Sequence, residues 1–216
     1  MASGEHPTIE WQGPVPVATR YGDPYYSLQD GAAEARHVFL DGNDLPDRLR
    51  DGFHVAELGF GTGLNALVLS AAWRDPGIVR MTSFEAHPME ADDLARALSA
   101  FPDIDATPLL DVWPARRFRL GAVEVEVVEG DARESLPVWQ DKADAWFLDG
   151  FAPARNPELW EEMLMEEVAR HTAPGGTFAT YTAAGHVRRA LTKAGFEVER
   201  RPGFGRKRHM SIGRLP

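Results

Sequence analysis

The stretch Glu57-Leu-Gly-Phe-Gly-Thr-Gly63 decides the fold of this 216-residue chain. It follows the apolar residues 53–56 and precedes the helix-like run 64–72, so the sequence predicts a strand, a glycine turn and a helix. Glycine has no Cβ and tolerates positive φ, which lets the backbone of such a turn lie close to a ligand. The dinucleotide pattern G-x-G-x-x-G has its third glycine one place later, where this chain has Leu64. A tight turn with no ligand is the alternative interpretation.

Composition is that of an ordinary globular protein, with 44% hydrophobic and 26% charged residues in a length that suits one domain. No stretch reaches the ~20 apolar residues that span a bilayer. The first residues lack the basic and apolar regions of a signal peptide, and there is no cysteine. We therefore expect a cytoplasmic protein without a membrane partner. The seven histidines show no ligand spacing, so no metal is expected.

Charge is unevenly distributed along the chain. The net charge of −10 argues against unspecific wrapping of nucleic acid, because phosphate neutralisation supplies most of that affinity. Segment 186–209, however, carries eight Arg and Lys against two Glu, so it is +6 while the rest of the chain is −16. This distribution is compatible with one localised contact to a polyanion. A solvated surface of salt bridges is the other interpretation.

Residues 1–50 read as an N-terminal extension that packs on the core and is too small to be a domain of its own. Prolines at 7, 14 and 16 make a helix unlikely to form in the first twenty residues. The pattern there predicts short extended pieces around Trp11 and 15–17, and a strand at 25–28. A short helix at 31–40 and a helical turn at 45–49, capped by Asp44, follow.

Residues 51–216 alternate strands with helices. The expected elements are strand 55–58, helix 64–73, strand 80–84, helix 90–101, the inserted hairpin 117–128, strand 143–148, helix 158–172 ending at Pro174-Gly-Gly176, strand 177–182, helix 185–194, and strands 196–201 and 207–212. Alternation of this kind predicts an α/β fold with a doubly wound, mostly parallel sheet and ligands at the carboxyl ends of its strands. The last two strands are joined too tightly for a parallel crossover, so they should form an antiparallel hairpin.

The glycine turn, with an acidic residue just before it, resembles motif I of class I methyltransferases, which bind S-adenosylmethionine (SAM) in a Rossmann-like fold. That resemblance implies a seven-stranded sheet, mostly parallel with one reversed strand. It also implies a single methyltransferase domain over 51–216. The residues expected to bind SAM around the turn are Gly59, Phe60, Gly61, Thr62, Gly63 and Asn65.

Three carboxylates follow predicted core strands. Glu85 ends the second strand and can accept hydrogen bonds from ribose hydroxyls; an exposed surface Glu is the alternative. Asp131 stands where the methyltransferase fold usually faces the adenine amino group, and it is an equally good helix cap before Glu134. Asp149 follows the fourth strand, where methyltransferases of this class place acceptor-binding groups. A simple turn aspartate is the alternative there.

Longer stretches carry a more specific resemblance. They are 26–31, 38–45, 58–65, 203–208 and the motif Trp146-Phe-Leu-Asp-Gly-Phe-Ala-Pro-Ala-Arg-Asn-Pro-Glu-Leu-Trp160. Together they resemble the tRNA 5-methylaminomethyl-2-thiouridine methyltransferase family, which is the methyltransferase half of bifunctional MnmC and also occurs alone as MnmD. The resemblance runs from about Tyr25 to Ile212. The flavin-dependent oxidase half has no counterpart here, so we expect no FAD in this chain. Either a standalone enzyme or an excised domain fits this pattern.

This resemblance implies methyl transfer to the 5-aminomethyl group of a wobble uridine in tRNA. It makes Asp149 the residue that holds the acceptor amine, and it makes the anticodon loop the partner. An oxidase activity outside this chain would generate the amine. Acceptor binding is assigned to Phe151, Asn156 and Tyr181, and phosphate binding to Arg188, Arg189, Arg206, Lys207 and Arg208. Core packing is the alternative for the aromatic residues.

Two other functions fit parts of the pattern. Methyl or aminopropyl transfer to a small polyamine uses a similar fold, and an acidic body would attract a cation. The basic segment 186–209 has no purpose in such an enzyme. A non-catalytic module that senses SAM or binds RNA is the second alternative. A nicotinamide dehydrogenase is disfavoured by the glycine spacing.

Overall fold

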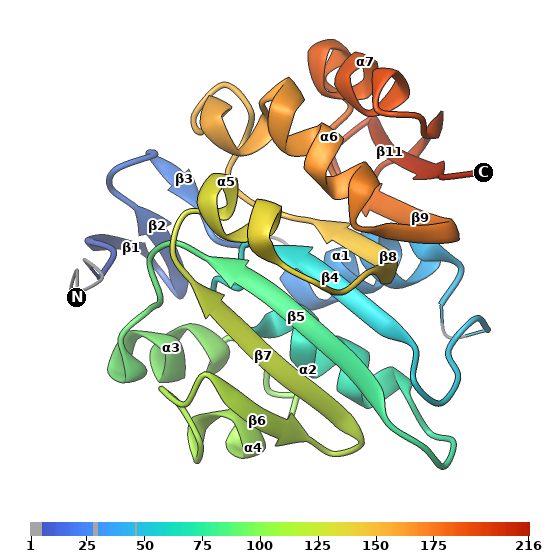
Figure 1. The fold of residues 1–216 in the computed structure, drawn as a ribbon. Coiled ribbons are helices and arrows are strands. Elements are labelled where there is room, and N and C mark those ends of the chain that lie inside the picture. The colour runs from blue at the N-terminus through green and yellow to red at the C-terminus, as the bar shows by residue number, and fades with distance from the viewer. Residues whose placement is uncertain (1–5, 28–29, 46) are drawn as a thin grey trace.

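Two β-sheets organise the protein, which the computed structural model describes for residues 6–27, 30–45 and 47–216. Within these residues the larger sheet has eight strands (Figure 1). From one edge to the other they are β10 (Glu197–Pro202), β11 (His209–Arg214), β9 (Thr172–Thr180), β8 (Ala143–Leu148), β4 (His54–Leu58), β5 (Val79–Glu85), β7 (Val123–Glu129) and β6 (Arg117–Leu120).

The centre of this sheet is parallel, as the alternation of strands and helices predicts. β9, β8, β4, β5 and β7 pair in parallel, whereas β11 pairs antiparallel with β9 and with β10. The expected C-terminal hairpin and reversed strand are therefore confirmed. The inserted hairpin is β6 with β7, and β6 adds an eighth strand at the edge of the seven implied by the class I resemblance.

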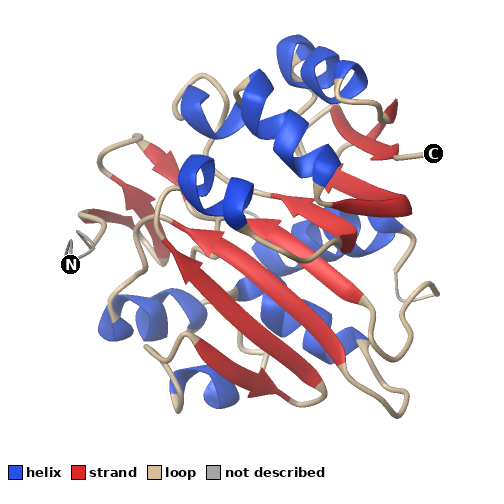
Figure 2. Cartoon of the chain, in the orientation of Figure 1, coloured by secondary structure: helices blue, strands red, loops and turns tan. Residues whose placement is uncertain are grey.

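Helices cover both faces of the sheet (Figure 2). One face carries α1 (Gly31–Ala35), η1 (Arg36–Leu40), η2 (Asp41–Asn43), α2 (Leu64–Ala72), α3 (Ala91–Leu98) and α4 (Thr107–Leu110). The other face carries α5 (Ala132–Ser135), η3 (Leu136–Val138), η4 (Pro157–Trp160), α6 (Glu162–Arg170) and α7 (Gly185–Lys193). The central strands β4 and β8 are consequently covered on both faces, which explains their nearly continuous burial.

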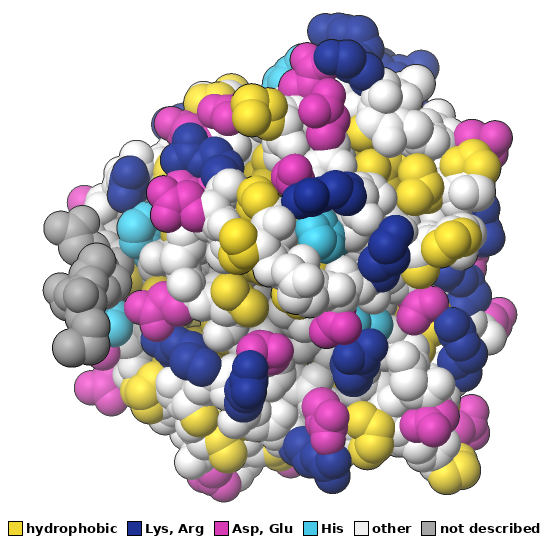
Figure 3. All heavy atoms as spheres, in the orientation of Figure 1, with side chains coloured by type: hydrophobic (Ala, Val, Ile, Leu, Met, Phe, Trp, Pro, Cys, Tyr) yellow, Lys and Arg dark blue, Asp and Glu magenta, His cyan; other side chains and the backbone are white. Residues whose placement is uncertain are grey.

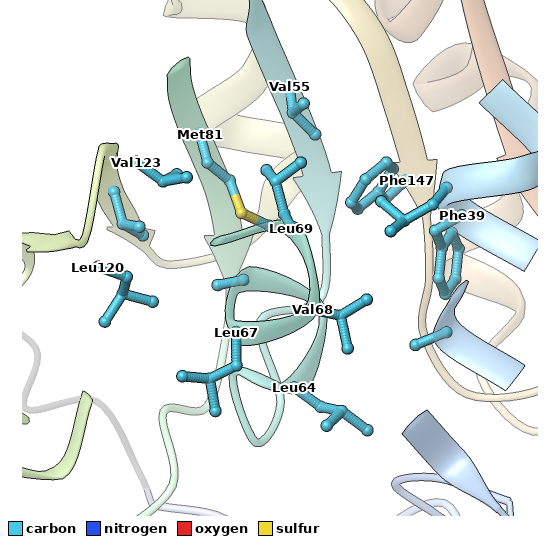
Figure 4. Close-up of a cluster of buried hydrophobic side chains, with 14 of the residues drawn as sticks. Phe39, Val55, Leu64, Leu67, Val68, Leu69, Met81, Leu120, Val123 and Phe147 are labelled. Carbon is cyan, nitrogen blue, oxygen red and sulfur yellow. The ribbon is translucent and has the colours of Figure 1, made fainter. Parts of the chain in front are cut away.

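Helix α2 is the centre of the first core layer. Its residues 64–69 are all buried, and Leu67, Val68 and Leu69 belong to one cluster with Val55 of β4 and Phe147 of β8 (Figure 4). Burying each such side chain stabilises the fold by about 1.5–3 kcal/mol. The helix is therefore firmly held, and so is the glycine turn at its N-terminus.

The N-terminal extension forms the smaller sheet, from β1 (Ile9–Gln12), β2 (Val15–Ala18) and β3 (Asp23–Pro24). It is tied to α3 of the main layer. The Tyr26 hydroxyl donates to the Ala97 carbonyl at 3.0 Å, and the Arg96 guanidinium lies 3.8 Å from the Trp11 ring centroid. These contacts place the loop between β2 and β3 at the carboxyl edge of the large sheet.

Two expectations for this extension are wrong. The strand expected at 25–28 lies instead at β3, because Pro24 and Asp23 pair with Val17 and Ala18; Tyr25 and Tyr26 form a bend, and residue 28 is outside the described residues. Asp44 does not cap a helical turn. Its φ of +56° is left-handed and ends η2, and the expected turn includes residue 46, also outside the described residues. The expected helix 31–40 is confirmed as α1 and η1.

The expected helix 158–172 is interrupted. η4 and α6 are separated by Glu161, whose ψ of 149° is extended, and the Trp160 indole donates to the Phe151 carbonyl at 2.9 Å. Pro174-Gly-Gly176 does not end that helix but lies within β9. The pairing of β9 with β8 steps from Ala143–Thr172 to Ala145–Thr177, so the residues between form a bulge. The other expected elements agree with the structure to within a few residues.

The surface mixes charges of both signs. On the face shown in Figure 3, Lys and Arg side chains alternate with Asp and Glu. Across the described part of the chain, no helix combines the length and the apolar character needed to cross a bilayer.

Candidate functional site

A cavity of about 980 Å³ opens at the carboxyl ends of the parallel strands. The loops after β4, β5, β7, β8 and β9 line it, together with the β2–β3 loop of the N-terminal extension. This is the edge at which doubly wound sheets bind ligands. Its volume is typical of small-molecule sites.

The glycine turn forms one wall of this cavity. Gly59, Gly61 and Gly63 have φ values of +87°, +54° and +71°, which side-chain-bearing residues rarely adopt. A Cβ on Gly63 would lie 2.6 Å from the Leu109 side chain and 2.8 Å from the Phe60 ring. A Cβ on Gly61 would lie 3.3 Å from Tyr25. These positions therefore require glycine both for the backbone conformation and for the contacts with neighbouring side chains. Phe60 and Thr62 also line the cavity.

The carboxylate of Glu85 stabilises this turn by hydrogen bonds. One of its carboxylate oxygens accepts from the Gly61 N–H at 2.9 Å, and the other accepts from the His87 N–H at 2.8 Å. Each oxygen keeps a second lone pair for a further donor. The side chain lies at the cavity wall, so it is positioned for a ligand hydroxyl as well as for the turn.

Asp131 is the N-cap of α5 and also lines the cavity. Its carboxylate accepts from the Arg133 backbone N–H at 2.8 Å and from the Arg133 guanidinium. These hydrogen bonds, partly offset by burial, hold the pKa of Asp131 below its ordinary value. The capping function is therefore present, at a position that faces the cavity.

A buried polar chain joins the turn to Asp149. The Asn65 amide nitrogen donates to Glu57 Oε1 and to Asp149 Oδ2, at 2.8 Å each. Glu57 is fully buried and also accepts from the Ser83 hydroxyl at 2.6 Å. Burial raises the pKa of Glu57 to about 8 and that of Asp149 to about 6, in both cases against the effect of these hydrogen bonds. Glu57 therefore keeps its proton to a higher pH than Asp149, which ionises first.

Aromatic side chains form another part of the cavity wall. Phe151 stacks on Tyr21 with ring centroids 4.6 Å apart, and Tyr25 meets it edge-on at 5.1 Å. The Tyr181 hydroxyl donates to the Gly150 carbonyl at 2.7 Å, and burial raises the pKa of Tyr181. Asn156 lines the same cavity. The three residues expected from the sequence to bind the acceptor therefore all line this one cavity.

The five basic residues expected to bind phosphate are distributed over different places. Arg206 and Lys207 line the cavity, but Arg208 is exposed outside it. Arg188 and Arg189 lie on α7 along a separate shallow hollow. Lys207 pairs with Glu34 at 2.7 Å, and its Nζ lies 4.0 Å from the centroid of the Tyr181 ring. In this conformation Lys207 belongs to the cavity wall.

Sequence reasoning missed several residues of the wall. Tyr21 comes from the extension, and Glu34 from α1 pairs with Lys207. Arg155 is an exposed residue that lines the cavity, and its Nη1 lies 2.9 Å from the position that a Cβ on Gly22 would take. The long motif 146–160 contains Arg155, but no local pattern links Tyr21 or Glu34 to this edge of the sheet. Among the described residues, no group of three or more His, Asp or Glu is arranged to hold a metal ion.

Comparison with known proteins identifies the family of the chain. A family model described as S-adenosyl-L-methionine-dependent methyltransferase matches residues 107–216, half of the chain. The chain belongs to this family. The class I fold and SAM as methyl donor, which motif I implies, are thereby confirmed.

Curated relatives of this methyltransferase carry a more specific name. The "tRNA 5-methylaminomethyl-2-thiouridine biosynthesis bifunctional protein MnmC" of Marinobacter nauticus is 42% identical over 95% of the chain and 36% of the relative. The protein of that name from Caulobacter vibrioides is 45% identical over 90% of the chain and 35% of the relative. The chain thus spans about a third of the length of these relatives.

Solved structures agree on the fold. The crystal structure of MNMC2 from Aquifex aeolicus superposes with a TM-score of 0.77 at 24% identity, covering 99% of this chain and 72% of that one. A methyltransferase from Pyrococcus furiosus has a TM-score of 0.54 at 18% identity, covering 96% of this chain and 88% of that one.

Proposed function

We propose that this methyltransferase transfers a methyl group from SAM to the 5-aminomethyl group of a wobble uridine, with or without a 2-thio group, in the anticodon loop of tRNA. The observation that carries the proposal is the 42–45% identity to the MnmC proteins over 90–95% of the chain. Their names specify tRNA and the 5-methylaminomethyl-2-thiouridine product.

The residues around the glycine turn fit SAM. Residues 59–62 line the cavity, and the two backbone-bound oxygens of Glu85 lie beside them. We assign SAM binding to the turn residues, to Glu85 for the ribose and to Asp131 at the adenine end. SAM supplies an electrophilic methyl group when bound.

The acceptor side is assigned to Asp149 and the aromatic wall. An alkylamine has a pKa near ~10, so most of it is protonated at neutral pH, and the proton must leave before the nitrogen can attack. An ionised Asp149 can accept a hydrogen bond from the amine and orient its lone pair. Positioning of this kind can account for ~7–11 kcal/mol of a barrier. Phe151 and Tyr181 offer ring faces for an extruded base, as in other RNA-loop readers.

Arg206 at the cavity mouth is our candidate for a phosphate contact, with its neighbours Lys207 and Arg208 as further candidates, and Arg188 and Arg189 are candidates for a second contact along the separate hollow on α7. A cation at the mouth fits an RNA backbone and would repel a polyamine. We further infer that 1–50 is an extension of a single methyltransferase domain over 51–216, since Tyr21 and Tyr25 complete its cavity. The tRNA substrate favours a cytoplasmic location, with the amine supplied by an oxidase activity outside this chain.

The decisive assay uses labelled SAM. The protein is incubated with tRNA from cells that lack the modification and carry the 5-aminomethyl group, and the labelled nucleoside is identified after digestion. We expect label in 5-methylaminomethyluridine or its 2-thio form. A parallel reaction contains spermidine without tRNA. Label in spermidine alone would favour a polyamine enzyme, and no label in either acceptor despite SAM binding would favour a non-catalytic module.

A further inference from the structure

One amide side chain links two carboxyl groups at the base of the cavity. Asn65 uses both hydrogens of its amide nitrogen, one on Glu57 Oε1 and one on Asp149 Oδ2. The remaining oxygen of Asp149 accepts from the Gly150 N–H at 2.8 Å. Both oxygens of Asp149 are therefore held by donors of fixed position. The Asp149 carboxylate also fixes the orientation of the Asn65 amide, because an ionised carboxylate oxygen accepts from the amide nitrogen and would repel the amide oxygen.

The fold keeps this arrangement rigid. Strands β4 and β8 pair in parallel with Leu58 opposite Leu148, so Asp149 follows directly beside Gly59. A Cβ on Gly59 would lie 3.4 Å from the Asp149 carbonyl oxygen, which shows how closely the two strand ends approach. Asn65 is the second residue of the firmly packed helix α2 and is itself only 8% exposed. Its side chain thus connects the end of β4, beside the proposed SAM-binding turn, with the end of β8, where Asp149 lies.

Glu57 anchors the other end of the link. It is 0% exposed and its second oxygen accepts from the Ser83 hydroxyl, so its carboxyl group has no freedom to turn away. An anchor of this kind restricts the rotamers of Asn65, which in turn restricts those of Asp149. Supporting hydrogen bonds that lock a reactive side chain are a general requirement for precise catalytic geometry.

We propose that Asn65 is a positioning residue for the acceptor carboxylate Asp149, anchored by Glu57, and not a residue whose main role is to bind SAM. This inference rests on the proposed function, since it takes Asp149 as the group that orients the acceptor amine. It differs from the sequence expectation, which places Asn65 among the SAM-binding residues. The structure commits both of its N–H donors to carboxyl groups.

The test compares Asn65→Ala with Asn65→Leu, which is similar in size and shape but has no hydrogen-bond donor. We expect kcat on tRNA to fall about 10- to 100-fold in both, since a misplacement near 1 Å costs about that much. The Kd for SAM, measured by calorimetry, should change less than about threefold. Asp149→Asn and the double variant Asn65→Ala/Asp149→Asn complete a cycle. The double variant should be no slower than Asp149→Asn alone, because Asn65 acts through that carboxylate.

A readout that needs no substrate separates this inference from the proposed function. Carbon-13 NMR of the Asp149 carboxyl group in protein without ligands follows its titration, and Asn65→Ala should raise its pKa because a donated hydrogen bond is lost. The charged or titratable groups facing Asp149 are Glu57, Lys207, Glu34 and Tyr181, and the substitution leaves all four in place.

Ser70→Ala is the matched control on the same helix. It removes the hydrogen bond from the Ser70 hydroxyl to the Leu120 carbonyl, neither of which lines the cavity, and should leave kcat unchanged. A Kd for SAM that rises tenfold with unchanged kcat would overturn the proposal, as would an Asp149 titration that Asn65→Ala does not move. If the wild type methylates no tRNA, the proposed function fails, and the NMR titration still decides whether Asn65 holds Asp149.

Discussion

Replacing Gly63 by alanine tests whether the glycine turn depends on the space at this position as well as on backbone freedom. Gly63 has a φ of +71°, and an added Cβ would lie 2.6 Å from a Leu109 methyl and 2.8 Å from the Phe60 ring. Leu109 is fully buried, and Phe60 is stacked on Trp113 with centroids 5.2 Å apart, so neither side chain can easily move. A left-handed alanine costs about 1–2 kcal/mol. The overpacking adds about 1–3 kcal/mol.

Gly52→Ala is the matched control. Gly52 has nearly the same φ, +75°, but an added Cβ there meets nothing within 4 Å. It should therefore lose only the about 1–2 kcal/mol of backbone strain. Both substitutions restrict the unfolded chain equally, so that contribution cancels in the comparison. The expected excess loss for Gly63→Ala is thus about 1–3 kcal/mol.

Urea denaturation measures the free energy of unfolding of both variants, and calorimetry measures their Kd for SAM. We expect SAM binding to weaken in Gly63→Ala, because Phe60 lines the cavity and must shift, and to be unchanged in Gly52→Ala. Equal losses of stability in the two variants would refute the reasoning. They would show that Leu109 and Phe60 accommodate the methyl group and that only the positive φ matters.

Three further predictions concern the acidic pair and the cavity mouth. Asp149→Asn should keep the Kd for SAM and lower turnover about 100-fold or more, because the amide cannot orient the amine as a carboxylate does; a Kd that rises in step with the loss of turnover would contradict this. Burial raises the pKa of Glu57 from 4.5 to about 8, so the native state keeps a proton that the unfolded state loses. The stability this gives is complete below pH 4.5 and is lost as pH rises to about 8. Between about pH 5 and about pH 9, the free energy of unfolding should accordingly fall more steeply for the wild type than for Glu57→Gln. Parallel curves for the two proteins would contradict the raised pKa of Glu57. Arg206→Gln should reduce the slope of log affinity for tRNA against log salt by about 1, whereas Arg74→Gln, at an exposed position outside the cavity and the α7 hollow, should not; an unchanged slope for Arg206→Gln would remove it from the phosphate contact.

Local sequence patterns were sufficient for the framework of the site. The alternation of apolar strands and helices from residue 53 onward predicts the parallel sheet, and the sharp end of each strand locates Glu85, Asp131 and Asp149. Where a local pattern is compatible with two structures, the sequence alone does not decide between them. Pro174-Gly-Gly176 resembles a helix end but forms a bulge, because the register between β8 and β9 requires extra residues there.

What the sequence determined by itself is therefore the type of fold and the order of the carboxylates along the strand ends, since strands and turns depend on neighbouring residues. Only the tertiary structure decided which side chains meet. Asn65 reaches Asp149 across 84 residues because β4 and β8 are neighbours in the sheet. Lys207, which looks like a phosphate ligand in a basic run, pairs with Glu34 of α1 because the β10–β11 loop ends at the same edge. Contacts of this kind depend on strand order and register, which no local pattern encodes.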